Sequence, residues 1–338
     1  LTYEQLSDPD FDTTANRSLI MMDPPEHTRY RKLVSRSFTP RAMAGYEDMI
    51  RAQMAEYLDP LMGRDEFDLV GEFSAPFPVE IICALLGIDD REKRQHIRHL
   101  ADITLHREEG EATGGAAAHE AMIEQAMLFY EFAAHKRSHP GDDICTALIE
   151  ARVETEDGEL TSLTDEEIAG FCSLLGAAGS ETVTKAVANA AVLFHRHPDQ
   201  WQKVKDDPTR IPDAVEEVLR YWAPSQYQGR MSTTDMEWHG VTVPAGKPVF
   251  LLTGAANHDE REFTDPDAFD IDRDQRLAIS LGHGIHTCLG AALARMETAV
   301  AIDEIRRRWP DFTVDEDRCE RVQMSNVAGY STVPVRTN

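Results

Sequence analysis

One helical pattern, from residue 164 to residue 197, constrains the fold of this chain more than any other feature. Thr164 and Glu167 form a capping box at its start, and Pro198 closes it. Large apolar residues recur between them at helical spacing. About 30 residues at roughly 1.5 Å each make a helix of about 45 Å, enough to cross a whole domain. Because residues 42–160 also have mostly helical patterns, we expect a predominantly α-helical fold.

Two glycines, Gly176 and Gly179, lie in the middle of this helical pattern. Each costs about 1 kcal/mol relative to alanine in a helix interior. Such a cost suggests that another group approaches the helix closely, and tight packing of a second helix is the alternative that the residues leave open.

A glycine-rich loop around Cys288 is the second constraint. Gly282, Gly284 and Gly290 surround the cysteine, and apolar residues at helical spacing follow it as far as Arg308. We therefore expect Cys288 at or just before a helix N-terminus, where free backbone N–H groups and the helix dipole favour a thiolate. A thiolate on a loop without bulky side chains suits axial ligation of haem iron.

Two other interpretations of Cys288 remain open at this point. A single cysteine is most often a small buried apolar residue. His283 and His286 precede it and could suggest zinc, but the chain has no Cys-x-x-Cys pair that would complete such a site.

A basic segment follows the prolines at positions 24 and 25, which suit a helix start. His27 and Arg31 are four residues apart and share one helix face, which could simply be a solvated charged face. The segment 29–41 carries five basic residues and no acid, in a chain of net charge −26. This local reversal of charge indicates either a solvated face or a docking patch for an acidic electron donor.

Strand-like segments are few. Residues 236–243 alternate, and the turn at 244–246 would lead into a strand at 249–252, which predicts a β-hairpin. Short strand-like pieces recur between residues 311 and 338, where 327–330 is expected to form a turn that reaches into a pocket.

Composition excludes several classes of protein. With 42% hydrophobic and 28% charged residues, the chain is an ordinary globular protein. Its net charge of −26 argues against a nucleic-acid partner. No apolar run approaches the roughly 18 residues of a membrane span and no signal peptide is visible, so we expect no membrane association. Five scattered cysteines favour a cytoplasmic location. No linker divides the chain, and we expect a single domain over residues 1–338.

The chain resembles the cytochrome P-450 superfamily, in its soluble bacterial type. The pattern Gly-x-Gly-x-His-x-Cys-x-Gly around Cys288 is the most specific of five motifs that occur in the family's order and span nearly the whole chain. The resemblance implies a mainly α-helical, cytochrome P-450-like fold with small β-sheets. The five motifs occupy residues 23–31, 176–182, 217–220, 230–246 and 280–290.

The resemblance also assigns roles to individual residues. Cys288 would ligate the iron of haem b (iron protoporphyrin IX). Thr182 and Glu181 would form the catalytic acid–alcohol pair that handles dioxygen and relays protons from solvent, where the long helix loosens over the iron. The other residues that would contact the haem or its propionates are His27, Arg31, Ala178, Gly179, Arg230, His286 and Gly290.

The implied activity is haem-thiolate monooxygenation, in which one oxygen atom from O2 enters an apolar small-molecule substrate. Electrons would come from a separate ferredoxin-type donor with an NAD(P)H-dependent reductase, because no fused flavin or iron–sulfur segment is visible. Two alternatives remain: a peroxide-driven peroxygenase, against which the intact Glu181–Thr182 pair argues, and a non-catalytic haem-binding or sensor protein. The segments expected around the substrate are 11–22, 100–125, 174–182, 224–228 and 327–330.

This sequence departs from the family pattern in three places. Leu281 stands where a phenylalanine usually packs near the ligating sulfur, which would change the redox potential. Ala268 replaces the third basic residue of the structural cluster of Glu217 and Arg220, and Arg273 is the nearest substitute. The chain also lacks the family's usual N-terminal residues, so we expect an incomplete N-terminal sheet lobe.

Overall fold

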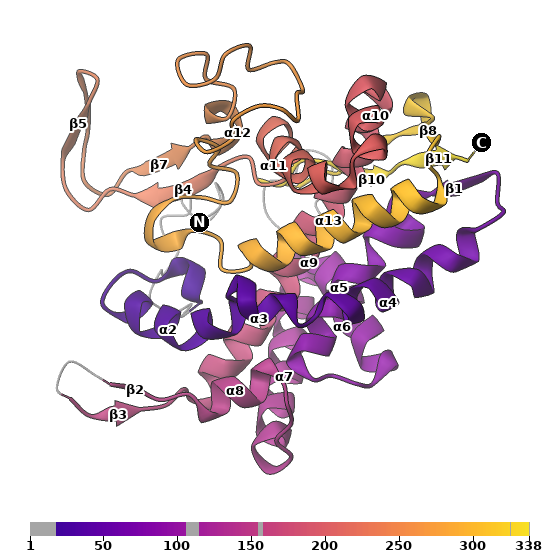
Figure 1. The fold of residues 1–338 in the computed structure, drawn as a ribbon. Helices are drawn as coiled ribbons and strands as arrows, with labels where there is room; N and C mark the ends of the chain where they lie inside the picture. Colours follow the sequence, from indigo (N-terminus) through magenta and orange to yellow (C-terminus); the bar gives the residue numbers. More distant parts are fainter. Residues whose placement is uncertain (1–17, 106–114, 155–157, 325, 338) are drawn as a thin grey trace.

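The computed structural model describes residues 18–105, 115–154, 158–324 and 326–337. Helix α9 (Asp165–Arg196) crosses the middle of the molecule (Figure 1). The Glu167 N–H donates to the Thr164 hydroxyl at 3.2 Å, and the Thr164 N–H donates to the Glu167 carboxylate at 2.9 Å. The predicted capping box and long helix are therefore confirmed, and 32 residues at about 1.5 Å each span roughly 48 Å.

The C-terminal half of α9 is buried on all sides. Every residue from Val183 to Phe194 is buried, which is typical of a helix in the centre of a large core. The long helices that pack against α9 are α5 (Pro76–Leu86), α6 (Arg91–Leu105), α7 (Ala116–Ser138), α11 (Ile211–Tyr221) and α13 (Ala291–Arg308).

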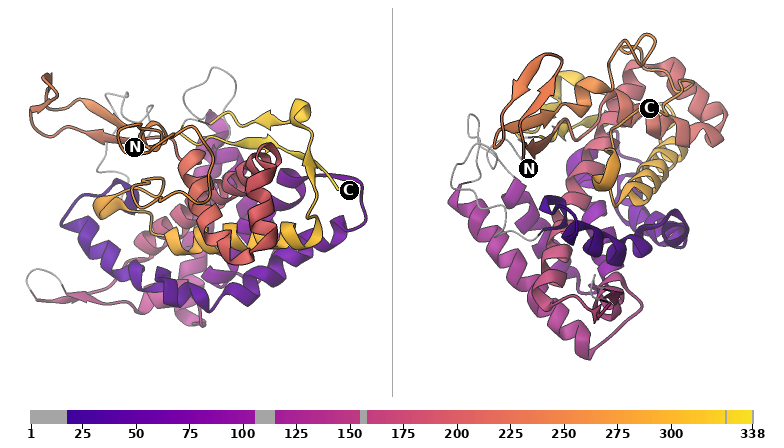
Figure 2. Two further views of the ribbon diagram at one scale, coloured as in Figure 1. Left: turned by 45° about the horizontal axis from the view of Figure 1, so that its top comes forward. Right: turned by 90° about the vertical axis from the view of Figure 1, so that its left-hand side faces the viewer.

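Three N-terminal helices run along one side of the molecule. They are α2 (Glu26–Ser35), α3 (Pro40–Ala44) and α4 (Glu47–Leu58), and both α3 and α4 pack against α13 (Figure 2). Since α13 follows the loop around Cys288, this packing brings two distant motifs to the same side of the fold. The remaining helices are α8 (Ile144–Glu150), α10 (Pro198–Asp206) and α12 (Thr253–Ala256).

The strands in the described residues form small antiparallel sheets, as predicted. One sheet has three strands and joins β1 (Glu66–Asp68), β11 (Pro334–Arg336) and β8 (Thr313–Val314). The two-stranded sheets are β2 (Val153–Glu154) with β3 (Leu160–Thr161), β4 (Gln228–Met231) with β7 (Pro248–Leu251), β5 (Met236–Trp238) with β6 (Val241–Val243), and β9 (Glu320–Arg321) with β10 (Tyr330–Thr332).

The predicted hairpin between 236–243 and 249–252 is wrong in its pairing. Strands β5 and β6 pair with each other, because His239 and Gly240 both have positive φ (47° and 79°) and close a two-residue turn between them. Strand β7 instead pairs with β4, where Arg230 lies opposite Val249. The alternation over 236–243 marked two short strands rather than one.

A buried ion cluster fixes the segment before the cysteine loop. Arg220 binds both carboxylate oxygens of Glu217, at 2.7 and 2.8 Å, and both side chains are fully buried. Arg273 approaches the same carboxylate at 3.4 Å, so the predicted substitution for the residue missing at Ala268 is confirmed. Ala268 contributes only its carbonyl oxygen, which accepts from both arginines at 3.1 Å.

Across the described residues, no helix is both long enough and apolar enough to cross a membrane. Parts of the segments expected around the substrate, residues 11–17 and 106–114, lie outside the described residues.

Candidate active site

The loop around Cys288 is held open by its own backbone. Gly282 and Gly284 have φ near +77° and +78°, a region that a side chain strongly disfavours. The Cys288 N–H donates to the Leu281 carbonyl at 2.7 Å, which closes the loop. The Leu281 side chain packs partly against the core, and the Cys288 side chain is exposed. A Cβ added at Gly290 would have no atom within 4 Å. The sulfur therefore faces space that a flat group could occupy.

The balance of effects on the Cys288 thiol differs from our expectation. Although the side chain is exposed, the surrounding protein desolvates the sulfur and raises the pKa of Cys288. A hydrogen bond from the Gly290 N–H and the charges of Arg31 and Arg295 oppose this effect. Cys288 lies three residues before the start of α13 at Ala291, and desolvation is the largest of these effects. A bound metal ion would supply the missing stabilisation.

Basic side chains from three elements converge beside this loop. His27 on α2 is buried, with 2% of its surface exposed, and its ring centre lies 4.3 Å from that of His286. Arg31, one turn further along α2, donates to the Thr287 carbonyl at 2.6 Å and so ties α2 to the loop. Arg230 on β4 is close enough to affect the charge of His286. The structure thus brings together all four residues predicted to hold propionates.

This cluster has a shortage of negative charge. Desolvation lowers the pKa of His27 and of His286, and neighbouring positive charges lower both further, while Asp23 gives only a partial opposing effect. The buried Nε2 atom of His27 has no hydrogen-bond partner among the described residues. A buried nitrogen without a partner is costly, so the cluster is suited to bind the carboxylates of a ligand.

The predicted distal motif lies on α9. Ala178 is exposed although it lies in mid-helix. The Thr182 hydroxyl donates to the Ala178 carbonyl at 3.1 Å, and the Ser180 hydroxyl donates to Gly176 at 2.9 Å. Since α9 is continuous through this region, the predicted loosening of the helix is wrong. These hydroxyl bonds stay within one helical turn, as is usual for serine and threonine inside helices.

Helix packing explains the two glycines of this motif. A Cβ on Gly179 would lie 2.8 Å from Ile82 of α5. A Cβ on Gly176 would contact Gln125 and Phe129 of α7 at 3.6 and 3.7 Å. The alternative of tight packing therefore accounts for Gly179, and its predicted contact with the cofactor stays a prediction.

Sequence reasoning missed the partner of Glu181. The Glu181 carboxylate forms an ion pair of 3.1 Å with Lys185, one turn further along α9. Glutamate followed four residues later by lysine is a recognised helical pair, so the spacing alone could have revealed it. The burial of Lys185, which is 4% exposed, was not visible in the sequence.

Comparisons with known proteins agree with this arrangement. The profile of the cytochrome P450 family matches residues 116–329. The putative cytochrome P450 123 of Mycobacterium tuberculosis is 40% identical over 319 residues, which cover 94% of this chain and 78% of that protein. This chain belongs to the cytochrome P450 family.

Solved structures of other P450s have the same fold. P450BioI, in complex with an acyl carrier protein ligated to hexadec-9Z-enoic acid, has a TM-score of 0.87 at 31% identity and covers 99% of this chain and 84% of its own. CYP109E1 from Bacillus megaterium, in complex with corticosterone, has a TM-score of 0.87 at 33% identity and covers 95% of this chain and 86% of its own. The predicted mainly α-helical P450 fold is confirmed.

Family membership also defines the cofactor and the class of enzyme. P450s bind haem b through a cysteine thiolate, so haem b is the cofactor of this P450 and the chain is a monooxygenase. The residues present fit the group, because an exposed sulfur lies beside a basic cluster that contains the buried, unpartnered nitrogen of His27. Among the described residues, no group of three histidine, cysteine or acidic side chains is arranged so that it could hold a metal ion.

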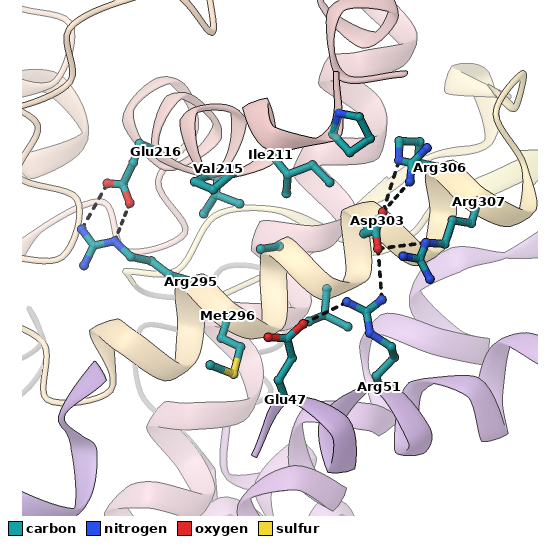
Figure 3. Close-up of a pocket in the computed structure, with 14 residues that line it drawn as sticks. Glu47, Arg51, Ile211, Val215, Glu216, Arg295, Met296, Asp303, Arg306 and Arg307 are labelled. Carbon is teal, nitrogen blue, oxygen red and sulfur yellow. Dashed lines mark hydrogen bonds and ion pairs between the residues drawn. The ribbon is translucent and has the colours of Figure 1, made fainter. Parts of the chain in front are cut away.

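A cavity of about 550 Å³ opens between α4, α11 and α13 (Figure 3). Apolar side chains such as Val215 and Met296 line its middle. Arg295 and Glu216 form an ion pair at one end, and Arg51 and Asp303 form another at 3.0 Å at the other end. Because the charge of Arg295 also acts on Cys288, this end of the cavity lies on the same side of the P450 as the cysteine loop.

The predicted basic docking patch is smaller than the sequence suggested. Arg29 forms an ion pair with Glu167, and Arg31 donates to the cysteine loop, so neither is available at the surface. Lys32, Arg36 and Arg41 are exposed and have no ion-pair partner within the described part of the chain. We call these three residues the basic patch.

Proposed function

We propose that this P450 uses Cys288 as its haem ligand and inserts one oxygen atom from O2 into an apolar small-molecule substrate. The observation that carries the proposal is the exposed Cys288 sulfur beside a basic cluster in which the buried Nε2 of His27 has no hydrogen-bond partner among the described residues. Per cycle, one O2, two electrons and two protons convert the substrate and yield one water. Haem supplies the oxygen activation, and the protein positions, dries and protonates.

The basic cluster holds the haem by its two propionates in this proposal. His27 and Arg31 reach them from α2, Arg230 from β4 and His286 from the cysteine loop. Charge-assisted bonds to carboxylates are stronger than neutral ones, and the buried Nε2 of His27 gains the partner that it lacks. Neither Gly290, where an added Cβ would meet no atom within 4 Å, nor the exposed Ala178 would obstruct the group.

Thr182 and Glu181 deliver protons in this proposal. Both lie on the face of α9 that contains Ala178, because these positions are three or four residues apart. For this role the Thr182 hydroxyl would have to leave the Ala178 carbonyl, to which it donates at 3.1 Å. Glu181 passes on protons from solvent, and the side chains that surround it decide how readily it does so.

A small acidic protein of the ferredoxin type delivers the electrons, itself reduced by an NAD(P)H-dependent reductase. Its docking surface is the basic patch of Lys32, Arg36 and Arg41, together with the adjacent cavity. Exposed arginines and lysines in a chain of net charge −26 attract an acidic partner locally. Two helices that carry this patch approach the cysteine loop and the helix after it, because Arg31 of α2 donates to Thr287 and α3 packs against α13. We place the reaction in the cytoplasm, where such donors occur.

The substrate is an apolar, lipid-like molecule. This proposal is supported by the molecules bound in two solved relatives, corticosterone in one and a fatty acid ligated to acyl carrier protein in the other.

Replacement of the cysteine tests the haem assignment. In Cys288→Ser, we expect the reduced carbon-monoxide complex to lose the red-shifted Soret band of thiolate ligation. Cys319→Ser is the matched control, because this second cysteine is also solvent-accessible but lies outside the loop. A thiolate band that survives in Cys288→Ser, or disappears in Cys319→Ser, would contradict the assignment.

Reversed charges test the docking surface. We expect Lys32→Glu with Arg36→Glu to slow reduction by a ferredoxin at least about tenfold at low salt, with a weaker difference at high salt. Thr182→Ala separates the monooxygenase from the peroxygenase. NAD(P)H-coupled turnover should fall while peroxide-driven turnover persists, and a loss of both alike would argue against the proposed proton route.

A further inference from the structure

Lys185 is buried beside the distal motif without being part of any motif that the family supplies. It lies on α9 with 4% of its surface exposed. Its ammonium group is 3.1 Å from the Glu181 carboxylate, whose side chain is 17% exposed. Lysine is rarely buried unless it is paired, because removing the charge from water is costly. The ion pair with Glu181 offsets part of this desolvation cost.

A turn near the C-terminus leaves a slot for the Lys185 side chain. A Cβ on Gly329 would lie 2.7 Å from Lys185 Cβ and 2.9 Å from its Cγ, and φ at Gly329 is +156°. Any side chain at this position would therefore displace the lysine. The turn is itself fixed, because the Gln226 N–H donates to Asn326 and the Ala328 N–H donates to Pro224, both at 2.8 Å.

Helix α6 adds opposite charges to the same region. The charges of Glu181 and Lys185 both act on Asp102, the former raising and the latter lowering its pKa, which burial raises overall. Arg98, one turn earlier on α6, lies 3.8 Å from Asp102. Two acids and two bases thus form a charge-balanced cluster between α6 and α9, and we call it the α6–α9 cluster. Glu181 belongs both to this cluster and to the proton-relay pair.

We propose that Lys185 is a positioning residue that holds the Glu181 carboxylate along α9 beside Thr182, and that Gly329 provides the slot that the lysine needs. The proposal rests on the proposed function, because it concerns how Glu181 is kept ready to accept and pass on a proton. Without a cation, a carboxylate in this nearly buried site would lose its main favourable interaction and would either take up a proton or turn away.

Infrared difference spectroscopy on the haem-loaded protein tests the proposal without any substrate. At pH 7 we expect Lys185→Met to gain a protonated-carboxyl band that is absent from the parent protein. The band must disappear in the double variant Lys185→Met/Glu181→Gln, which assigns it to Glu181. Lys185→Arg should restore the parent spectrum, and Gly329→Ala should produce the same band more weakly. Lys205→Met is the control, because Lys205 lies on α10 and pairs with Asp311, neither of which belongs to the α6–α9 cluster.

The outcomes separate this inference from the proposed function. If the parent protein does not show the thiolate Soret band, the proposed function itself is wrong. The role of Lys185 would be overturned if the parent protein has that Soret band but Lys185→Met shows neither change. In that case the variant lacks the carboxyl band, and its crystal structure keeps Glu181 in the parent orientation. A crystal structure of Lys185→Met with Glu181 turned away supports the proposal even without a band, because positioning is then lost.

Discussion

Arg29 Nη2 lies 3.1 Å from Glu167 Oε1, and the other oxygen of Glu167 accepts the N–H of Thr164. One carboxylate therefore caps the long helix α9 and binds it to α2, the helix that carries His27 and Arg31. Neither side chain of the pair is more than 25% exposed. The sequence placed Arg29 in a docking patch, but the fold uses it to orient two helices that form opposite sides of the site.

Loss of this link should reduce stability more than electron transfer. We expect Arg29→Ala to lower the free energy of unfolding by about 1 kcal/mol, because a partly buried carboxylate loses its cation. Urea denaturation measures this change. Lys32→Ala, on an exposed position of the same helix, should leave the midpoint unchanged but slow reduction by a ferredoxin. If Arg29→Ala slows reduction by a ferredoxin and leaves the denaturation midpoint unchanged, Arg29 belongs to the docking surface instead.

Arg273 should be essential to the buried cluster around Glu217. We expect Arg273→Ala to cost about 2 kcal/mol of unfolding free energy, since the fully buried Glu217 carboxylate loses one of its two cations. Arg276→Ala provides the comparison, because its pair with Asp274 is exposed. Equal midpoints for the two variants in denaturant would show that Arg273 does not replace the residue missing at Ala268.

Glu297 on α13 should make stability depend on pH. Burial raises its pKa well above the usual range, and neither carboxylate oxygen has a partner among the described residues. The folded protein therefore holds a proton that the unfolded chain releases above about pH 4.3. Its contribution to stability is full below that pH and is lost as the pH rises toward the raised value.

Glu297→Gln keeps the shape of the side chain but cannot ionise. We expect its denaturation midpoint to fall less than that of the parent protein between pH 5 and pH 8. Two parallel pH profiles would mean that Glu297 is already ionised in the folded protein.

His27 should control how firmly the cofactor is held. In His27→Leu, we expect haem to transfer to a competing apoprotein about 10 to 100 times faster, because one charge-assisted bond to a propionate is lost. His119→Leu changes an exposed histidine on α7 and should have no effect. Unchanged transfer in His27→Leu would mean that its buried nitrogen faces something other than a propionate.

Local patterns were enough to predict several parts of this P450. The capping box at Thr164 and Glu167, the helix starts and the glycines around Cys288 depend on neighbours in the chain, so they are visible in the sequence. The order of the motifs then indicated the family, which the comparisons confirm. The roles of His27, Arg230 and Thr182, and the single domain over residues 1–338, stay predictions.

Other predictions failed because they depended on competition between neighbours in space. The hairpin at 236–243 paired differently because two residues with positive φ closed a tighter turn. The thiol of Cys288 has a raised pKa because desolvation outweighs the Gly290 hydrogen bond and the charges of Arg31 and Arg295. The alternative of tight packing at Gly179 likewise depended on a distant residue, Ile82 of α5, and the contact of Gly179 with the cofactor stays a prediction.

By itself, the sequence determined the long helix, the open cysteine loop and the family, because these follow from the spacing of side chains along one segment. Only the tertiary structure decided which charges are free and which are paired. In the sequence, Arg29, Lys185 and Arg273 are all simply basic residues. In the fold, Arg29 joins two helices, Lys185 lies buried beside Glu181, and Arg273 completes an ion cluster. The energy of a charge depends on its solvent exposure and on its nearest opposite charge, and both are set by the packing of distant segments.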